Sequence, residues 1–170
     1  KRLRRGYMRF GEPERHTVIK IISGGQTGVD RAALDAARGR GVATGGYCPK
    51  GRRAEDGTIP AAYAELIELA TRDYPTRTRR NVAAADATLI LTRGRLAGGS
   101  AYTAQVAQRL GKPTLIVDLA QRPRIAVVDA WLALHRVQVL NVAGPRESKA
   151  PGIYQNAKRF LARLWPVGRE

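Results

Sequence analysis

The apolar residues of the chain form two alternating patterns, short β-branched runs and longer stretches with helical spacing. Short runs that are hydrophobic on both sides predict strands of a sheet covered on both faces. Such runs lie at 18–22, 42–47, 88–92, 114–119 and 137–142. The stretch 65–70 fits either a further strand or the end of a helix.

Between these runs, apolar side chains recur three or four residues apart, which predicts helices. The first helix begins at Val29 and carries a stripe of alanines that ends at Gly39 and Gly41. Ser100 is a suitable N-cap for a helix over 101–110. Further helices are expected at 76–85, around 125–132 and around 157–164.

Alternating strands and helices predict an α/β fold with a doubly wound, mostly parallel sheet and helices on both faces. Residues 17–170 are expected to form one domain, preceded by a basic, flexible arm at 1–16. In such sheets ligands bind outside the carboxyl ends of the strands, where the strand order reverses. If the strands 18–22 and 88–92 are neighbours, the glycine turns that follow them face one another.

The first of these turns is 23–30, which reads Ser-Gly-Gly-Gln-Thr-Gly-Val-Asp. Gly24, Gly25 and Gly28 allow several backbone amides to converge on one anion, and the next helix presents its positive end there. The alternative is that these glycines only permit a tight turn. A second glycine turn, Gly98-Gly99-Ser100, favours a phosphate-binding site.

The charge of the chain also favours an anionic ligand. The sequence has 30 Lys and Arg and 14 Asp and Glu, which gives a net charge of +16. Such a surface attracts anionic ligands and holds nucleic acid non-specifically, if at all. A solvated arginine-rich surface is the alternative. The sequence has no apolar run long enough for a membrane helix and one cysteine, Cys48, so a cytoplasmic protein is expected. No spacing of His, Cys or carboxylate residues predicts a metal site.

Four segments resemble the putative molybdenum carrier family: 23–35, 46–57, 77–81 with 86–90, and 141–148. These proteins are relatives of the algal molybdenum-cofactor carrier protein, within the Rossmann-like group that includes the cytokinin-activating phosphoribohydrolases. The resemblance spans roughly residues 19 to 154. It implies a Rossmann-like homo-oligomer, a dimer or tetramer, that holds the molybdenum cofactor (molybdopterin) or a nucleotide.

The resemblance also implies which residues bind the ligand. They lie in the two glycine turns, a basic loop, one helix and the last loop of the chain. They are Gly24, Gly25, Gln26, Thr27, Gly28, Asp30, Lys50, Gly51, Arg52, Arg77, Asn81, Gly98, Gly99, Ser100, Arg146, Glu147 and Ser148.

One departure bears on catalysis. The phosphoribohydrolases have a glutamate after the second glycine motif, where this chain has Gln105. An amide cannot act as a general acid or base, so a binding protein is favoured over an enzyme. The carboxylates of Asp30, Glu55, Asp56 and Glu147 remain available, which leaves a nucleotide- or ribose-phosphate-processing enzyme as the alternative. A nucleotide-sensing module is a third reading.

Overall fold

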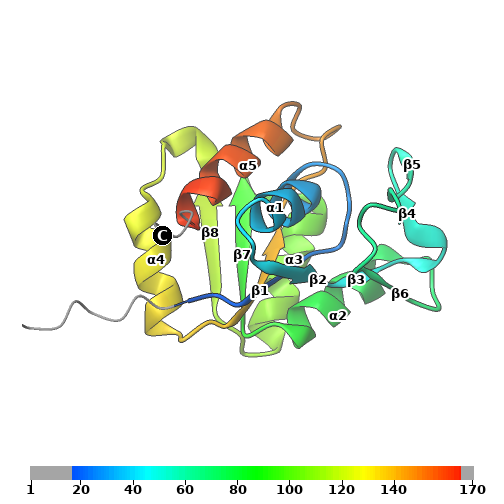
Figure 1. Cartoon of the computed structure of the whole chain (residues 1–170), viewed down its shortest axis with the longest axis horizontal. Helices are drawn as coiled ribbons and strands as arrows, with labels where there is room; N and C mark the ends of the chain where they lie inside the picture. Colours follow the sequence, from blue (N-terminus) through cyan, green and yellow to red (C-terminus); the bar gives the residue numbers. More distant parts are fainter. Residues whose placement is uncertain (1–16, 166–170) are drawn as a thin grey trace, which may run out of the picture.

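The computed structural model describes residues 17–165, and its centre is a sheet of five parallel strands (Figure 1). The strands are β1 (Lys20–Ile22), β2 (Ala43–Gly45), β7 (Ala87–Thr92), β8 (Thr114–Asp118) and β9 (Val139–Ala143). Their order across the sheet is β2-β1-β9-β7-β8. The predicted α/β, Rossmann-like fold is confirmed, whereas the arm expected at 1–16 lies outside the described residues.

Helices cover both faces of the sheet. One face is packed by α1 (Val29–Arg38), α4 (Ile125–Leu134) and α5 (Ile153–Leu164) and the other by α2 (Tyr74–Ala84) and α3 (Gly98–Arg109). The alanine stripe of α1 is buried, which lets this helix lie close to α5 and to the sheet. Phe160 and Trp165 are buried in the same core, as expected from their apolar spacing.

The position of β9 separates the two strands, predicted at 18–22 and 88–92, that the sequence analysis considered as neighbours. β9 pairs with β1 on one side and with β7 on the other, so 18–22 and 88–92 are not adjacent. Parallel strands are joined by long crossovers, so the chain can return its last strand to the middle of the sheet. Three loops, after β1, β9 and β7, therefore end side by side at one edge.

The prediction of one continuous strand over 42–47 is wrong. Gly46 has φ of +124°, and a Cβ there would lie 2.1 Å from the Ser23 carbonyl oxygen. The chain leaves the main sheet at this glycine and forms β3 (Tyr47–Cys48), which pairs with β6 (Ile67–Glu68). The stretch 65–70 thus holds a short strand and no helix end.

A small lobe follows between β3 and β6. It contains the 3₁₀ turn η1 (Lys50–Arg52) and a hairpin of β4 (Arg53–Ala54) and β5 (Gly57–Thr58). Its core consists of apolar side chains that pack on α1: Leu34, Cys48, Ala54, Ile59, Tyr63 and Leu66. Figure 1 shows this lobe at one end of the molecule, with α4 at the other.

The N-cap predicted at Ser100 is also wrong. Helix α3 begins three residues earlier than predicted, at Gly98, with Ala97 as its N-cap, and Ser100 lies buried in its first turn. The sequence pattern missed this start because glycine is a poor helix residue. No side chain caps the helix.

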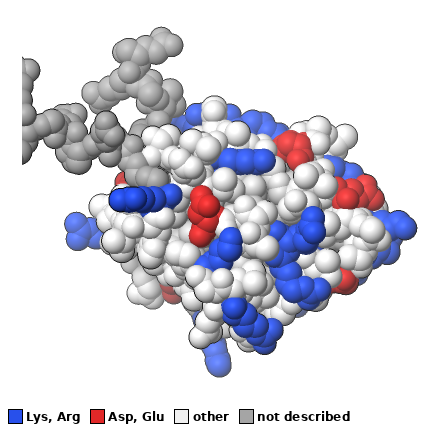
Figure 2. All heavy atoms as spheres, turned by 90° about the horizontal axis from the view of Figure 1, so that it is seen from below, with Lys and Arg blue, Asp and Glu red and all other residues white. Residues whose placement is uncertain are grey.

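Basic side chains are spread over the surface. Figure 2 shows Lys and Arg in separate groups across one face, with fewer acidic residues between them and no continuous basic stripe. Between residues 17 and 165 no helix has the length and apolar character needed to cross a bilayer.

Candidate ligand-binding cleft

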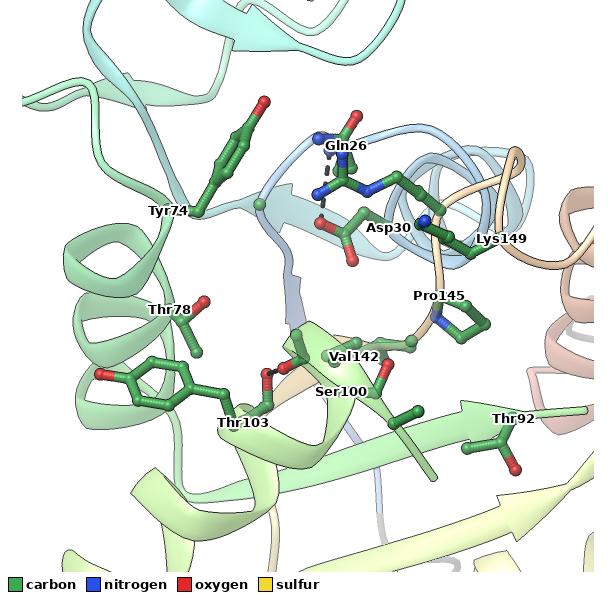
Figure 3. Close-up of a pocket in the computed structure, with 18 of the residues that line it drawn as sticks. Gln26, Asp30, Tyr74, Thr78, Thr92, Ser100, Thr103, Val142, Pro145 and Lys149 are labelled. Atoms are coloured by element: carbon green, nitrogen blue, oxygen red, sulfur yellow. Dashed lines mark hydrogen bonds between the residues drawn. The ribbon is translucent and has the colours of Figure 1, made fainter. Parts of the chain in front are cut away.

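A cleft of about 660 Å³ opens at the carboxyl ends of β1, β9 and β7. The loops after these three strands line it together with the start of α2 and the start of α3. Figure 3 shows side chains from all of these elements around the same hollow, among them Asp30, Tyr74, Ser100 and Pro145. This is the edge at which a doubly wound sheet binds its ligands.

The cleft contains some of the residues predicted for the site and excludes others. Those that line it are Gly24, Gln26, Asp30, Arg77, Asn81, Gly98, Gly99, Ser100 and Arg146. Those that do not line it are Gly25, Thr27, Gly28, Lys50, Gly51, Arg52, Glu147 and Ser148.

The turn between β1 and α1 already holds an anion of its own, the carboxylate of Asp30. Asp30 Oδ2 accepts a hydrogen bond from the Gln26 amide at 3.3 Å and lies 3.5 Å from Arg77 Nη1. Other amides of the turn are also used, since Thr27 N donates to Gln26 Oε1 and Val29 N to the Pro145 carbonyl. These contacts leave fewer amides for a phosphate than the glycine pattern indicates.

Burial raises the pKa of the Asp30 carboxyl above its ordinary value, and the Arg77 charge and the Gln26 amide offset this only in part. A carboxyl group with a raised pKa in a cleft can accept hydrogen bonds from a ligand or exchange a proton with it. Arg77 passes directly over Gly24, where a Cβ would lie 2.1 Å from its Nη1.

The glycines of this turn are therefore required by packing. A Cβ on Gly25 would lie 2.6 Å from a methyl group of Leu66, and one on Gly28 would lie 2.4 Å from the Pro145 carbonyl oxygen. Both glycines also have positive φ, +73° and +77°. Their first role is to let the turn pack against the lobe and the β9–α5 loop.

The glycines at the start of α3 have different surroundings, although Gly98 shares the positive φ, +53°. A Cβ on Gly98 or Gly99 would meet nothing within 4 Å, so these residues border open space in the cleft. The first backbone amides of a helix have no hydrogen-bond acceptor within the helix. The methyl side chain of the N-cap residue Ala97 cannot accept a hydrogen bond from them. This helix end is the part of the cleft where backbone amides and the helix dipole are free to meet an anion.

Gln26, which lines the cleft, holds a further donor that the described part of the chain leaves unpaired. Its Oε1 accepts from the amides of Thr27 at 3.0 Å and Glu55 at 2.9 Å, which fixes the orientation of the side chain. Its Nε2 is buried and has no hydrogen-bond partner among residues 17–165. A buried donor without a partner is costly, and a ligand acceptor would relieve that cost.

The basic loop predicted to bind the ligand lies in the small lobe. Arg52 donates to the carbonyls of Ile59, Pro60 and Tyr63, so it braces the lobe. Lys50 is exposed, and the Gly51 amide donates to Glu68. The structure does not bring these three residues to the cleft.

Three of the four candidate carboxylates hold neighbouring elements together. Glu55 accepts from the hydroxyls of Thr27 and Ser148, and Asp56 forms a two-bond pair with Arg31. Glu147 accepts from the amides of Gly152 and Tyr154 at the start of α5. Only Asp30 faces the cleft.

Gln105 is exposed on α3 and does not line the cleft. Asn81 holds β3 in place, because its side-chain amide exchanges two hydrogen bonds with the backbone of Tyr47, at 2.8 and 3.0 Å.

Cys48 is fully buried, and burial raises the pKa of its thiol. Within the part of the chain that the structure describes, no three His, Cys or carboxylate groups are placed to hold a metal ion.

The sequence interpretation missed several side chains that line the cleft. They are Tyr74, Pro75, Thr78, Thr92, Arg93, Arg95, Tyr102, Thr103, Asn141 and Lys149. Arg93 and Arg95 directly precede the second glycine turn, and a cation beside a glycine-rich segment is a sequence signal for anion binding. The threonines and tyrosines have no such signal, because helical spacing alone does not reveal which face meets a ligand.

Two comparisons with known proteins bear on the cleft. The model of the circularly permutated YpsA SLOG family matches residues 21–165. The fold is also similar to a crystal structure of a putative molybdenum carrier protein from Syntrophus aciditrophicus SB, with 46% sequence identity and a TM-score of 0.84 over 89% of this chain and 97% of that one. No curated protein matches significantly.

Glu55 ties the hairpin to the β1–α1 turn and to the β9–α5 loop, which predicts a pH-dependent stability. Burial opposes its ionisation, but the hydrogen bonds from Ser148 and Thr27 and the Arg146 charge hold its pKa below the ordinary 4.5. Its stabilisation is therefore fully present above this ordinary value and is lost as pH falls from there through the lower pKa of the folded protein. We expect Glu55→Gln to lower the free energy of unfolding by about 1–3 kcal/mol at neutral pH and by less below pH 4.

Urea unfolding of both proteins across this pH range measures the difference. Asp86→Asn serves as a control, because Asp86 caps the start of β9 away from the hairpin. A Glu55→Gln variant whose deficit does not shrink in acid would contradict the assignment.

Proposed function

The chain belongs to the circularly permutated YpsA SLOG family, and we propose that it is a carrier for an anionic phosphorylated cofactor. The observation that supports this best is the start of α3, where two glycines border open space and the first helix amides have no acceptor among residues 17–165. Arg93, Arg95 and Lys149 line the same cleft. A binding protein needs no catalytic group, and these parts are sufficient for retention of an anion.

The molybdenum cofactor is the cargo that we propose, because the similar crystal structure is that of a putative molybdenum carrier protein. A pterin with a phosphate group has both an anionic end and a flat heterocycle rich in hydrogen-bonding atoms. The α3 amides and the cleft cations would hold the phosphate. Gln26 Nε2, which lacks a partner in the stretch 17–165, and the Asp30 carboxyl offer a donor and an acceptor for the heterocycle.

Gly99→Ala tests this proposal without harming the fold. Its Cβ would meet no protein atom and alanine favours a helix, so the stability should stay the same or rise by up to about 1 kcal/mol. The methyl group would occupy the space in front of the helix amides. We expect at least about tenfold less pterin per subunit, measured as the fluorescent oxidised pterin that acid releases from protein purified from a molybdenum-using cell.

Gln105→Ala is the matched control, because Gln105 lies on the same helix and outside the cleft. It should retain the wild-type amount of pterin. The proposal is wrong if wild-type protein neither contains pterin nor takes up added cofactor, or if Gly99→Ala retains as much pterin as the control.

An enzyme acting on a nucleotide or ribose phosphate is a second candidate, and one observation favours it. Asp30 is buried in the cleft, its pKa is raised and Arg77 lies beside it. Catalytic acids and bases are commonly tuned in this way, so Asp30 could exchange a proton with a bound sugar or base. The other three candidate carboxylates do not line the cleft.

Asp30→Asn tests this candidate. If the protein releases base or phosphate from nucleoside monophosphates, we expect the variant to lose about 100-fold or more of kcat while Asp56→Asn keeps it. Product release followed by chromatography measures this. Equal turnover by the Asp30→Asn variant would exclude Asp30 as the catalytic group, and absence of turnover in the wild type would exclude the enzyme.

We also propose that the chain forms a homo-oligomer through the outer face of α4. From Ile125 to Leu134 this helix has no Lys or Arg, and its exposed side includes Val127 at 56% and Leu134 at 77% exposure. Apart from the exposed Asp129, the side chains of this helix are apolar, and a helix face of that kind is normally covered. Because copies of a chain with net charge +16 repel one another, this cation-free face is where a second copy can dock.

Leu134→Lys should therefore reduce the oligomer to a smaller species by placing a charge in an apolar contact. Native mass spectrometry reports the subunit number directly. Ile67→Lys is the matched control, because Ile67 is 56% exposed on the small lobe and outside both the cleft and α4. A wild-type monomer, or a Leu134→Lys variant with the wild-type mass, would refute this interface.

A further inference from the structure

Three guanidinium groups surround the ring of Tyr74 at the start of α2. The Cζ atoms of Arg53, Arg77 and Arg146 lie 4.7, 5.4 and 5.4 Å from its centroid. They come from three separate parts of the chain: the hairpin strand β4, the second turn of α2 and the β9–α5 loop. Figure 3 shows the Tyr74 ring extending from the first residue of α2 beside the cleft.

The protein neutralises this cluster incompletely. Arg77 has Asp30 at 3.5 Å and Arg146 has Glu55 at 3.8 Å, both long for an ion pair. Arg53 forms no ion pair with any residue from 17 to 165 and donates one long hydrogen bond, 3.4 Å, to the Arg72 carbonyl. Because all three guanidinium groups lie within 5.4 Å of the centre of one ring, an anion bound beside that ring would be attracted by all three charges.

The aromatic ring explains why the cations gather but does not neutralise them. A tyrosine face attracts a guanidinium weakly at an exposed site, and one ring has two faces for three cations. Arginine presents parallel N–H groups that suit a phosphate, and several arginines around one point are a common way to hold a dianion.

We propose that Arg53, Arg77 and Arg146 form an anion subsite around Tyr74, which takes a phosphate-type dianion and is separate from the first turn of α3. The cleft then has two anion-binding ends, one at α2 and one at α3, and its ligand carries an anionic group at each. The inference rests on the proposed function in placing a ligand in this cleft. It adds Arg53, and with it the small lobe, to the residues that bind that ligand.

The test uses the full-length chain and inorganic phosphate as the probe. Arginine side-chain Nε–Hε signals, assigned by removing each arginine in turn, are followed by NMR at constant pH and ionic strength. We expect the signals of Arg53, Arg77 and Arg146 to shift together and to saturate. Arg53→Gln should weaken the phosphate affinity, read from the Arg77 signal, by about tenfold or more.

Arg72→Gln is the matched control, because it removes the same charge from the neighbouring connection between β6 and α2. Among residues 17–165 no ring contact joins Arg72 to Tyr74. It should change the affinity less than about twofold, through the long-range field alone. The subsite is refuted if phosphate leaves the three signals unmoved, or if Arg53→Gln and Arg72→Gln weaken binding equally. Phosphate binding here without any pterin in the purified protein would refute the carrier and leave the subsite standing.

Discussion

The pairing of Asp30 with Arg77 determines how this cleft can work. A glycine-rich turn before a helix usually offers its amides to a phosphate, but here the carboxylate of Asp30 accepts from the Gln26 amide and lies beside Arg77. A second anion at the same point would be repelled while Asp30 is ionised. We therefore expect an anionic ligand to avoid the amides of this turn. It would instead use the uncapped start of α3 and the arginines around Tyr74, where Arg53 and Arg146 add charge to an Arg77 that Asp30 neutralises only in part.

The position of β9 brings these separate parts together. Because β9 lies between β1 and β7, its following loop runs between the two glycine turns and contributes Arg146 and Lys149 to the cleft. The same loop supports the β1–α1 turn, since the Pro145 carbonyl accepts from Val29 and leaves no room for a Cβ on Gly28. One placement of a strand thus determines both the packing of the turn and the cations of the cleft.

The sequence predicted the elements better than their neighbours. Apolar runs and helical spacing placed the five strands of the main sheet and all five helices to within a few residues, because burial imposes those periods directly. Strand order has no such local signal, and β9 looks like any other buried parallel strand. The sequence also did not reveal that the chain leaves the main sheet at Gly46. The positive φ of this glycine is explained by the close approach of Ser23, a contact between residues far apart in the sequence.

The site could be predicted only in part, because the long-range neighbours of a residue decide whether it binds a ligand or stabilises the fold. Sequence shows which residues can bind a phosphate, but the same residue types also stabilise folds. Arg52 is used on three carbonyls of its own lobe, whereas its neighbour Arg53 points to Tyr74.

The glycines divide in the same way. Gly25 and Gly28 are glycines because protein atoms occupy the space of a side chain, and Gly99 has no such neighbour. A glycine that packing does not require, at a helix start whose amides have no protein acceptor, is the better indicator of a ligand. By this criterion the second glycine turn is a better candidate than the first for binding a phosphate group.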